Sequence, residues 1–433
     1  MKTDFRPRPG KSTTKIFSAL LSAVAAILCI TGCNTDDHVF KGILIDSLDF
    51  LPVSISEDGK LLENSAWVGQ QTISADGRYI VFEAMYMDAT QIYLVNTASG
   101  VSKIISKSSN GTPGNRDSFQ ASIDDLGGNV IFLSWATNLA GGDGDLKPRI
   151  EPAVAYRYDI NNDKLENLGF VFESSFSLSG DGQILCAKRN GMPGCAAISG
   201  LSSWDLFSWV ESDDYEYWYS APVPNSDGSI VVFTTNRSLT PDDDNDHMDV
   251  YLVDTKGAGG IKRVSVGEHD APCDSYRPDI SADGNFVTFV SCLALEDPGL
   301  STIIDTYYFY DRGQNLIKAF PSTDTDFQGY THSDYSGFIP VLANQTPSIS
   351  DDGHFVALNW ILDGSTNVVI WDTQTDSIEP VVPDELIDLE NAPWWRPTFP
   401  RITPDGTMIL FGACEWPYGG NLCSLYVTDN PLL

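Results

Sequence analysis

The sequence has little positive charge. It holds 26 lysines and arginines against 59 aspartates and glutamates, with a net charge of −33 and five histidines. Residues 1–32 contain five of the basic residues and one acidic residue, which leaves 21 against 58, a net charge of −37, for residues 33–433. This charge disfavours nucleic acid and anionic lipid as partners and favours cations or basic partners. Acidic loops that only keep an exported protein soluble would give the same charge.

The sequence also lacks the short motifs of several enzymes and metal sites. It has no Gly-x-Ser-x-Gly, no His-Glu-x-x-His and no Cys-x-x-Cys, which are motifs of α/β-hydrolases, zinc proteases and zinc sites. The histidines are scattered without the spacing of metal ligands: His38, His247, His269, His332 and His354. We therefore assign no catalytic residue and expect a binding protein rather than an enzyme.

Only one long apolar run is present, and it lies near the N-terminus at 16–30, behind a positively charged leader. It has the length of a signal-peptide core and is short for a membrane span. It ends in Ile30-Thr31-Gly32-Cys33, which resembles the lipobox of bacterial lipoproteins. The resemblance implies a signal peptide over 1–32, acylation of Cys33 and an acidic tether over 33–46. A plain secretory signal with an incidental cysteine and a retained transmembrane anchor are the alternatives.

Six cysteines follow Cys33, and an even number is typical of disulfides in exported proteins. They fall into three couples that are close in sequence: Cys186 with Cys195, Cys273 with Cys292, and Cys414 with Cys423. The first and third couples bracket short segments that resemble hairpins. We predict disulfides and leave their connectivity open, with a metal site as the alternative.

One short pattern recurs along the chain: Ile-Ser or a similar pair, then x-Asp-Gly, then an apolar strand. The turn residues are Asp76-Gly77, Asp181-Gly182, Asp227-Gly228, Asp283-Gly284, Asp352-Gly353 and Asp405-Gly406, with Leu126-Gly127 as a degenerate seventh copy. Asp-Gly supplies the positive-φ residues of a tight turn, and the flanking apolar runs predict two paired strands.

A third strand is predicted after each turn, at 91–96, 154–159, 205–210, 249–254, 305–311, 367–372 and 424–429, and a fourth is clearest at 262–266. Four antiparallel strands per unit, with turns 46 to 69 residues apart, predict an all-β fold, a seven-bladed β-propeller over 47–433. The last unit ends after its third strand. We therefore expect an N-terminal strand near 51–56 to complete the last blade and close the ring, as in a Velcro closure.

These repeats resemble the PD40 repeats, which are similar to WD40 repeats, of TolB-like propellers in bacterial envelope proteins. The fourth unit carries the resemblance best, with Ser226-Asp227-Gly228, Phe233 and Asp249-Val250-Tyr251. The resemblance implies a periplasmic or surface-facing propeller that binds other molecules. The chain departs from TolB itself, because the stretch between Cys33 and the first repeat is too short for TolB's N-terminal α/β domain and because TolB is not a lipoprotein.

Two acidic loops are candidate calcium sites, because Ca²⁺ binds several oxygen ligands in a flexible loop. The candidate ligands are Asp243, Asn245 and Asp249 in one loop and Asp143 and Asp145 in the other. Neither loop has the turn glycine and terminal glutamate of an EF-hand. Turns shaped by aspartate and asparagine side chains are the alternative interpretation.

Aromatic residues in loop-like contexts are candidates for contact with a ligand, because exposed rings beside acids stack on sugars or cationic groups. The candidates are Tyr215, Trp218, Tyr335, Trp394 and Trp395. Packing between blades is the alternative role for such residues.

Three functions compete on this evidence. We expect a monomeric lipoprotein of the bacterial cell envelope, anchored by lipid alone and most consistent with the outer membrane, whose propeller binds or scaffolds a protein, peptide or glycan. The first alternative is a metal-dependent carbohydrate lyase, because propeller lyases gather ligands from several blades; His332 and His354 would be the residues to test. The second is a structural module stabilised by Ca²⁺.

Overall fold

The computed structural model describes residues 51–53, 71–140, 153–171, 176–189, 192–200, 220–256, 260–266, 274–292, 305–320, 346–362, 365–382, 395–415 and 423–433. Within these ranges the chain forms β-strands and one 3-10 turn, η1 (Ile198–Gly200), and no α-helix. None of the helical structure in these ranges is long and apolar enough to cross a membrane. The predicted signal peptide and Cys33 lie outside the described residues.

The described strands form seven sheets, one for each predicted blade. Blade 1 contains β2 (Tyr79–Tyr86), β3 (Ala89–Asn96) and β4 (Val101–Ile104), and blade 2 contains β5 (Ser118–Ile123), β6 (Asn129–Ser134), β7 (Val154–Asp159) and β8 (Lys164–Val171). Blade 3 contains β9 (Phe176–Leu178), β10 (Ile184–Arg189) and β11 (Met192–Ala197), and blade 4 contains β12 (Val223–Pro224), β13 (Ile230–Thr235), β14 (Asp249–Asp254) and β15 (Ile261–Arg263).

The remaining three sheets have four strands each. Blade 5 contains β16 (Tyr276–Ile280), β17 (Phe286–Cys292), β18 (Asp305–Asp311) and β19 (Leu316–Ala319). Blade 6 contains β20 (Ser348–Ile349), β21 (Phe355–Leu362), β22 (Ser365–Asp372) and β23 (Ile378–Pro380). Blade 7 contains β24 (Trp395–Ile402), β25 (Met408–Glu415), β26 (Cys423–Asp429) and the N-terminal β1 (Leu51–Pro52).

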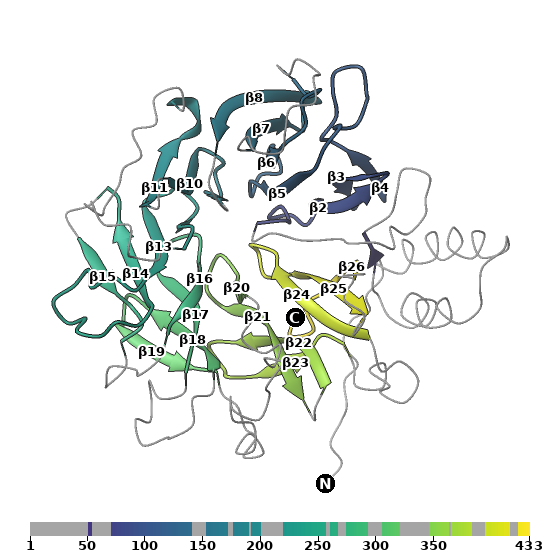
Figure 1. Cartoon of the computed structure of the whole chain (residues 1–433). Coiled ribbons are helices and arrows are strands. Elements are labelled where there is room, and N and C mark those ends of the chain that lie inside the picture. The colour runs from purple at the N-terminus through teal and green to yellow at the C-terminus, as the bar shows by residue number, and fades with distance from the viewer. Residues whose placement is uncertain are drawn as a thin grey trace, which may run out of the picture. The chain divides into compact units, whose positions relative to one another are not determined.

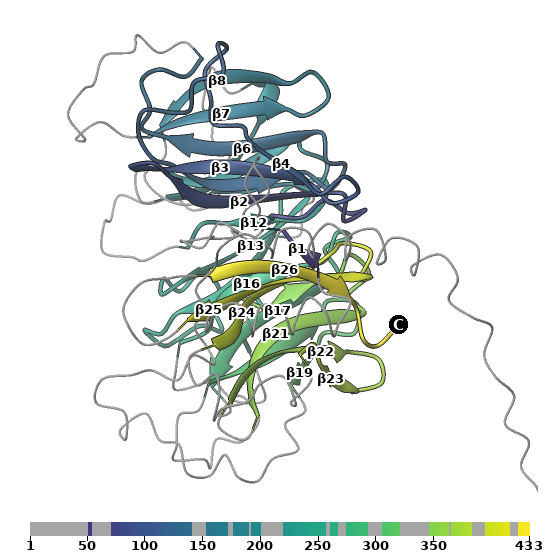
Figure 2. The same cartoon turned by 90° about the vertical axis from the view of Figure 1, so that its right-hand side faces the viewer.

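The blades follow one another around a ring in chain order, from purple at β2 to yellow at β26 (Figure 1). Strand β1 adds to the outer side of β26 (Figure 2), and next to it the Val53 N–H donates to the Leu425 carbonyl at 2.9 Å. Val53 is buried. The prediction of a seven-bladed propeller closed by an N-terminal strand is confirmed.

Blade 3 corrects one strand of the sequence analysis. Its third strand is β11, which pairs with β10 from Arg189 opposite Met192 onward, and Asn190-Gly191 lies between the two strands in the sequence. The predicted strand at 205–210 therefore does not pair with β10, and it lies outside the described residues. Asn-Gly is a strong two-residue hairpin signal, which explains why the chain turns back so early.

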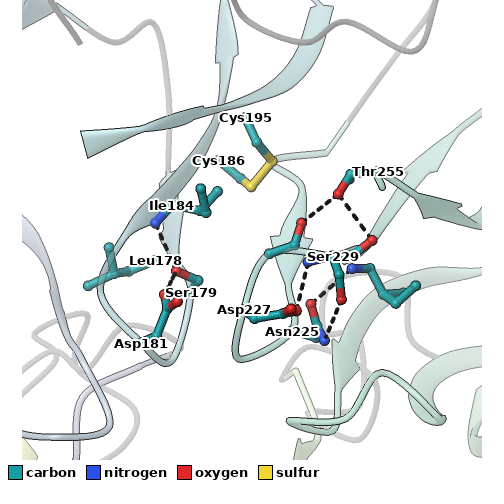
Figure 3. The surroundings of a disulfide bond; sticks show 12 residues. Leu178, Ser179, Asp181, Ile184, Cys186, Cys195, Asn225, Asp227, Ser229 and Thr255 are labelled. Atoms are coloured by element: carbon teal, nitrogen blue, oxygen red, sulfur yellow. Dashed lines mark hydrogen bonds between the residues drawn. A yellow bond between two sulfur atoms is a disulfide. The ribbon is translucent and has the colours of Figure 1, made fainter. Parts of the chain in front are cut away.

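The recurring turn owes its shape to one hydroxyl and one carboxylate. In blade 3, the Ser179 hydroxyl donates to the Asp181 carboxylate at 2.6 Å and accepts the Ile184 N–H at 2.9 Å (Figure 3). Gly182 follows with a φ of +69°, a conformation that glycine adopts without strain. In the degenerate turn of blade 2, Asp124 takes the serine's place and accepts the Gly128 N–H at 2.6 Å, so the turn forms without the usual aspartate.

The core lies between neighbouring blades and includes a repeated aromatic pair. In five blades a phenylalanine of the second strand lies opposite a tyrosine of the third, with ring centroids 5.2 to 6.1 Å apart. The pairs are Phe82–Tyr93, Phe132–Tyr156, Phe233–Tyr251, Phe289–Tyr308 and Phe411–Tyr426. All ten side chains are buried. Cross-strand stacking of this kind stabilises a sheet beyond burial alone.

Candidate functional site

Backbone hydrogen bonds join the turns of successive blades. The Ala75 N–H donates to the Asp125 carbonyl at 2.8 Å, and the Asp125 N–H donates to the Gly180 carbonyl at 2.9 Å. The same kind of bond joins blades 4 and 5, and blades 6 and 7, where the Asp351 N–H donates to the Pro404 carbonyl at 2.7 Å. Pro404 itself has no N–H to donate onward. The residue before each Asp-Gly pair, or its equivalent in blade 2, therefore lies where neighbouring turns meet.

Most blades have a small residue or proline at this meeting point: Ala75, Gly180, Ser226, Ala282 and Pro404. Two blades have an aspartate instead, Asp125 in blade 2 and Asp351 in blade 6. The Asp125 carboxylate lies directly over Gly180, because a Cβ built on Gly180 would be 1.8 Å from the Asp125 Oδ2 and 2.8 Å from the Ser226 Oγ. Asp125 thus reaches across the turn of blade 3 to a hydrogen bond with Ser226 of blade 4.

Burial makes the charges of both aspartates unfavourable. Burial, and then the nearby charge of Asp124, raises the pKa of Asp125 to about 6. Burial, and then the charges of Asp125 and Asp352, raises the pKa of Asp351 to about 7. The charge of Asp125 in blade 2 thus contributes to the raised pKa of Asp351 in blade 6, although the two residues are 226 positions apart in the sequence.

A third acid and an arginine belong to the same group. Burial raises the pKa of Asp279 on β16 to about 6, and the Asp279 charge contributes to the raised pKa of Asp351. The Asp279 Oδ2 accepts the Ile349 N–H of blade 6 at 3.1 Å. Arg401 on β24 is 6% exposed and donates to the carbonyls of Thr346 and Pro400 at 3.2 and 2.7 Å. Burial lowers the pKa of Arg401 to about 10, and the nearby Asp279 opposes that shift.

We call Asp125, Asp279, Asp351 and Arg401 the axial cluster. Its members come from blades 2, 5, 6 and 7, on the inner edge strands that lie nearest the centre of the ring in Figure 1 or on the turns that follow them. Ionisable groups whose pKa values are shifted by burial and by each other are typical of functional sites. Three carboxyls and one guanidinium in this arrangement are suited to holding a cationic group of a ligand.

Sequence reasoning missed the axial cluster. No short motif contains it, because its residues are spread from 125 to 401 and are brought together only by ring closure. One signal was available: aspartate at 125 and 351, where the other repeats have a small residue or proline.

The first predicted calcium loop contains a buried ion network. Arg263 Nη1 lies 3.3 Å from the Asp243 Oδ1 and 3.2 Å from the Asp249 Oδ2, and all three side chains are at least 94% buried. The Tyr251 hydroxyl also donates to Asp243, and the Ser265 hydroxyl donates to Asp249. The Asn245 Oδ1 accepts the His247 N–H at 2.7 Å, which is a turn contact. Arginine thus supplies positive charge where calcium was predicted.

The second predicted calcium loop, with Asp143 and Asp145, lies outside the described residues. Among the residues that the structure describes, no three histidine, cysteine or acidic side chains are grouped so as to hold a metal ion. Calcium binding stays a prediction.

The predicted aromatic site is largely outside the described part of the chain. Tyr215, Trp218, Tyr335 and Trp394 lie there, as does His332. Trp395 begins β24, opposite Glu415 in register. His354 lies immediately before β21, where its Nε2 is 3.2 Å from the Asp372 Oδ1 and its ring stacks on Phe355.

The structure gives the strand positions of five of the six predicted disulfide cysteines. Cys186 and Cys195 form a disulfide across β10 and β11 (Figure 3). Cys414 on β25 and Cys423 on β26 are directly opposite in register. Cys292 ends β17 opposite Asp305, and its predicted partner Cys273 lies outside the described residues.

No family model and no curated protein matches the chain. Solved structures match over most of it. An oligogalacturonate lyase from Vibrio parahaemolyticus is 13% identical over 89% of this chain and 97% of its own, with a TM-score of 0.54. The β-propeller domain of the Trilobed protease from Pyrococcus furiosus, reported with an open velcro topology, is 13% identical over 85% and 95%, with a TM-score of 0.50.

TolB from Acinetobacter baumannii also matches, at 15% identity and a TM-score of 0.40, and the match covers 67% of this chain and 58% of TolB. At these identities the matches establish architecture and not activity. The chain is a seven-bladed β-propeller, similar in fold to the oligogalacturonate lyase and to the propeller domain of the Trilobed protease.

Proposed function

We propose that this chain is a lipid-anchored protein of the bacterial cell envelope whose propeller binds or scaffolds a protein, peptide or glycan partner. The axial cluster would receive a cationic group of that partner. The observation that carries the proposal is that three acidic residues, from blades 2, 5 and 6, lie on inner edge strands or on the turns that follow them, where burial opposes their charges. Folding alone does not require such an arrangement, because the other blades have small residues at the positions of Asp125 and Asp351.

A bound cation would relieve the repulsion between these carboxylates. Each carboxylate has a pKa raised by burial, so an amine or guanidinium placed among them would bring their pKa values back towards the ordinary range. The net charge of −37 over residues 33–433 would also draw a basic partner towards the propeller. The lipobox-like segment ending at Cys33 supports the envelope location and a lipid anchor.

The proposal is tested by cross-linking in cells followed by capture of the full-length protein. The test variant is Asp125→Asn with Asp351→Asn, which removes two charges from the axial cluster while keeping the side-chain shapes. The matched control is Asp163→Asn with Glu166→Gln at the outer strand of blade 2, where Asp163 pairs with Lys103 and Glu166 with Arg157 on the exposed surface.

We expect the wild-type protein to enrich a specific partner, the axial variant to recover at least tenfold less of it, and the control to stay within twofold of wild type. Equal recovery by the axial variant would show that the axial cluster is not the point of contact. If the wild-type protein recovers only abundant lipoproteins, none of them enriched, the binding platform itself is wrong.

A further inference from the structure

Two cysteine couples occupy equivalent places in paired strands. Cys186 lies directly opposite Cys195 in the β10–β11 hairpin, and Cys414 lies directly opposite Cys423 in the β25–β26 pair. In both couples the second cysteine follows the first by nine residues. The first couple is joined by a disulfide, with its Cα atoms 4.0 Å apart.

The hydrogen-bond pattern shows that both couples are of the same kind. In an antiparallel pair, opposite residues alternate between hydrogen-bonded positions and closer, non-hydrogen-bonded positions. In blade 3 the Ile198 N–H donates to the opposite Gln183 carbonyl at 2.8 Å, and in blade 7 the Asn430 N–H donates to the opposite Thr407 carbonyl at 2.8 Å. These two pairs are therefore hydrogen-bonded, and they set the alternation in each sheet.

Counting along the strands from these reference pairs places the cysteines. Cys195 with Cys186 is three steps from the first reference pair, and Cys423 with Cys414 is seven steps from the second. Both counts are odd, so both couples are non-hydrogen-bonded pairs, whose Cα atoms lie about 4.5 Å apart. The backbone register therefore brings the Cα atoms of each couple within the range of separations that a disulfide spans.

We infer that Cys414 and Cys423 form a second disulfide, which links β25 to β26 in the blade that closes the ring. In the reaction, the thiolate of one cysteine attacks a small-molecule or protein disulfide and releases one donor thiol. The thiolate of the other cysteine then displaces the second donor sulfur. Two thiols lose two protons and two electrons, and the donor disulfide is reduced to two thiols. Oxidised glutathione is the electron acceptor in vitro, so the inference does not depend on the proposed envelope location.

The competing arrangements pair Cys414 or Cys423 with a cysteine of blade 5. Cys292 faces Asp305 across β17 and β18, so that strand pair offers it no cysteine. A disulfide between blade 5 and blade 7 would join the peptide that holds Cys414 and Cys423 to a peptide of blade 5. The proposed disulfide would not, and this difference distinguishes the two arrangements.

The test uses the purified full chain, incubated with oxidised glutathione, denatured, treated with N-ethylmaleimide and digested with trypsin without reduction. No lysine or arginine follows Arg401, so residues 402–433 form one tryptic peptide that holds both cysteines. We expect this peptide to be unalkylated and two hydrogen atoms lighter than its reduced form. Chymotrypsin, which cleaves after Tyr418, should then yield two fragments that separate only on reduction. Lys188 and Arg189 separate Cys186 from Cys195, so a linked pair of tryptic peptides in the same digest serves as the positive control.

Alkylation of both Cys414 and Cys423, or a linked peptide that joins either to Cys273 or Cys292, would overturn the inference. The variant Cys414→Ser supplies a second readout, because it should leave Cys423 fully reactive towards N-ethylmaleimide under denaturing conditions. Thermal melting of the Cys414→Ser, Cys423→Ser double variant should show a midpoint lower by a few degrees than that of the oxidised wild type. In the wild type, selective reduction of the Cys414–Cys423 bond should lower the midpoint likewise. An unchanged midpoint after that reduction would contradict the link.

Discussion

At the residue scale, two adjacent aspartates in the turn of blade 6 have opposite roles. The Asp352 Oδ1 accepts the Ser350 hydroxyl at 2.7 Å and the His354 N–H at 2.9 Å, so its carboxylate shapes the turn. Asp351 belongs to the axial cluster, where burial and neighbouring charges raise its pKa to about 7. The fold uses the Asp352 carboxylate as a hydrogen-bond acceptor, whereas it disfavours the charged form of Asp351.

This difference predicts a pH dependence. A pKa of about 7 in the folded state, against about 3.9 in the unfolded chain, means that the folded state keeps the Asp351 proton to higher pH. That contribution to stability is complete below about pH 4 and is lost as the pH rises through 7. We therefore expect Asp351→Asn to raise the unfolding free energy by about 1 kcal/mol at pH 8, after allowance for screening by solvent, and to change it little at pH 5.

Urea unfolding at both pH values measures the effect, and Asp352→Ala is the matched control. It should destabilise the protein by about 1 kcal/mol at both pH values, because it removes the acceptor of two hydrogen bonds. If Asp351→Asn destabilises the protein at pH 8, the carboxylate is favourable where it lies and the axial cluster is misjudged.

A second residue-scale prediction concerns Arg263. Its removal would leave Asp243 and Asp249 buried without their cation, so we expect Arg263→Ala to lower the unfolding free energy by about 3–5 kcal/mol. Arg157→Ala is the control, since the Arg157–Glu166 pair at 2.8 Å is solvent-exposed and should contribute below about 1 kcal/mol. Equal losses in the two variants would refute the buried network.

At the element scale, the turn of blade 3 has a glycine because of a side chain from blade 2. Gly180→Ala would place a methyl group 1.8 Å from the Asp125 Oδ2, and overpacking of this kind destabilises by about 1–3 kcal/mol. We expect the loss to be smaller by about 1 kcal/mol when Gly180→Ala is made in an Asp125→Ala background, because the closest clash is removed and only the approach to the Ser226 Oγ at 2.8 Å remains. A double-mutant cycle by urea unfolding measures this coupling, and additive effects would exclude the contact.

Local elements were predicted well where neighbouring residues determine them. The turns around Asp181 and Asp283 contain their own hydroxyl, carboxylate and glycine, so a short sequence pattern is sufficient to predict them. The third strand of blade 3 was misplaced because the aromatic stretch at 205–210 has higher strand propensity than Met192–Ala197, although the Asn-Gly sequence just before Met192 favours a hairpin to the nearer strand. Turn chemistry prevailed over propensity there.

At the scale of the whole molecule, ring closure predicts the effect of removing β1. A chain that begins at residue 57 lacks β1 and Val53, so β26 becomes an unpaired edge, and exposed edges promote self-association. Loss of the buried Val53 alone removes about 1.5–3 kcal/mol of stabilisation. We expect lower thermal stability and oligomers in size-exclusion chromatography, whereas a chain that begins at residue 47 should behave as the full propeller. Equal melting of the two truncated chains would show that β1 does not close the ring.

The candidate site could not be predicted to the same extent as the fold. Blade number and closure follow from a repeat that each unit displays by itself. The proximity of Asp125 to Asp351 depends on the curvature of all the sheets between them, and no pairwise spacing in the sequence records it. Arg263 was equally hidden, because only β14 and β15 pairing brings it to Asp249.

Pro404 leaves the junction between blades 7 and 1 without the backbone bond between turns that joins blades 1 and 2, 2 and 3, 4 and 5, and 6 and 7. Consecutive blades from 1 to 7 are joined by the chain itself, but blade 7 meets blade 1 only through β1 and side-by-side packing, and Pro404 has no N–H to donate across that boundary. A pulling force applied at the N-terminal end of β1 would therefore load this junction first and peel β1 from β26 before any blade unravels. Under such a force the propeller would open first at this junction. A disulfide between β25 and β26 would keep those two strands together, so that only β1 would separate.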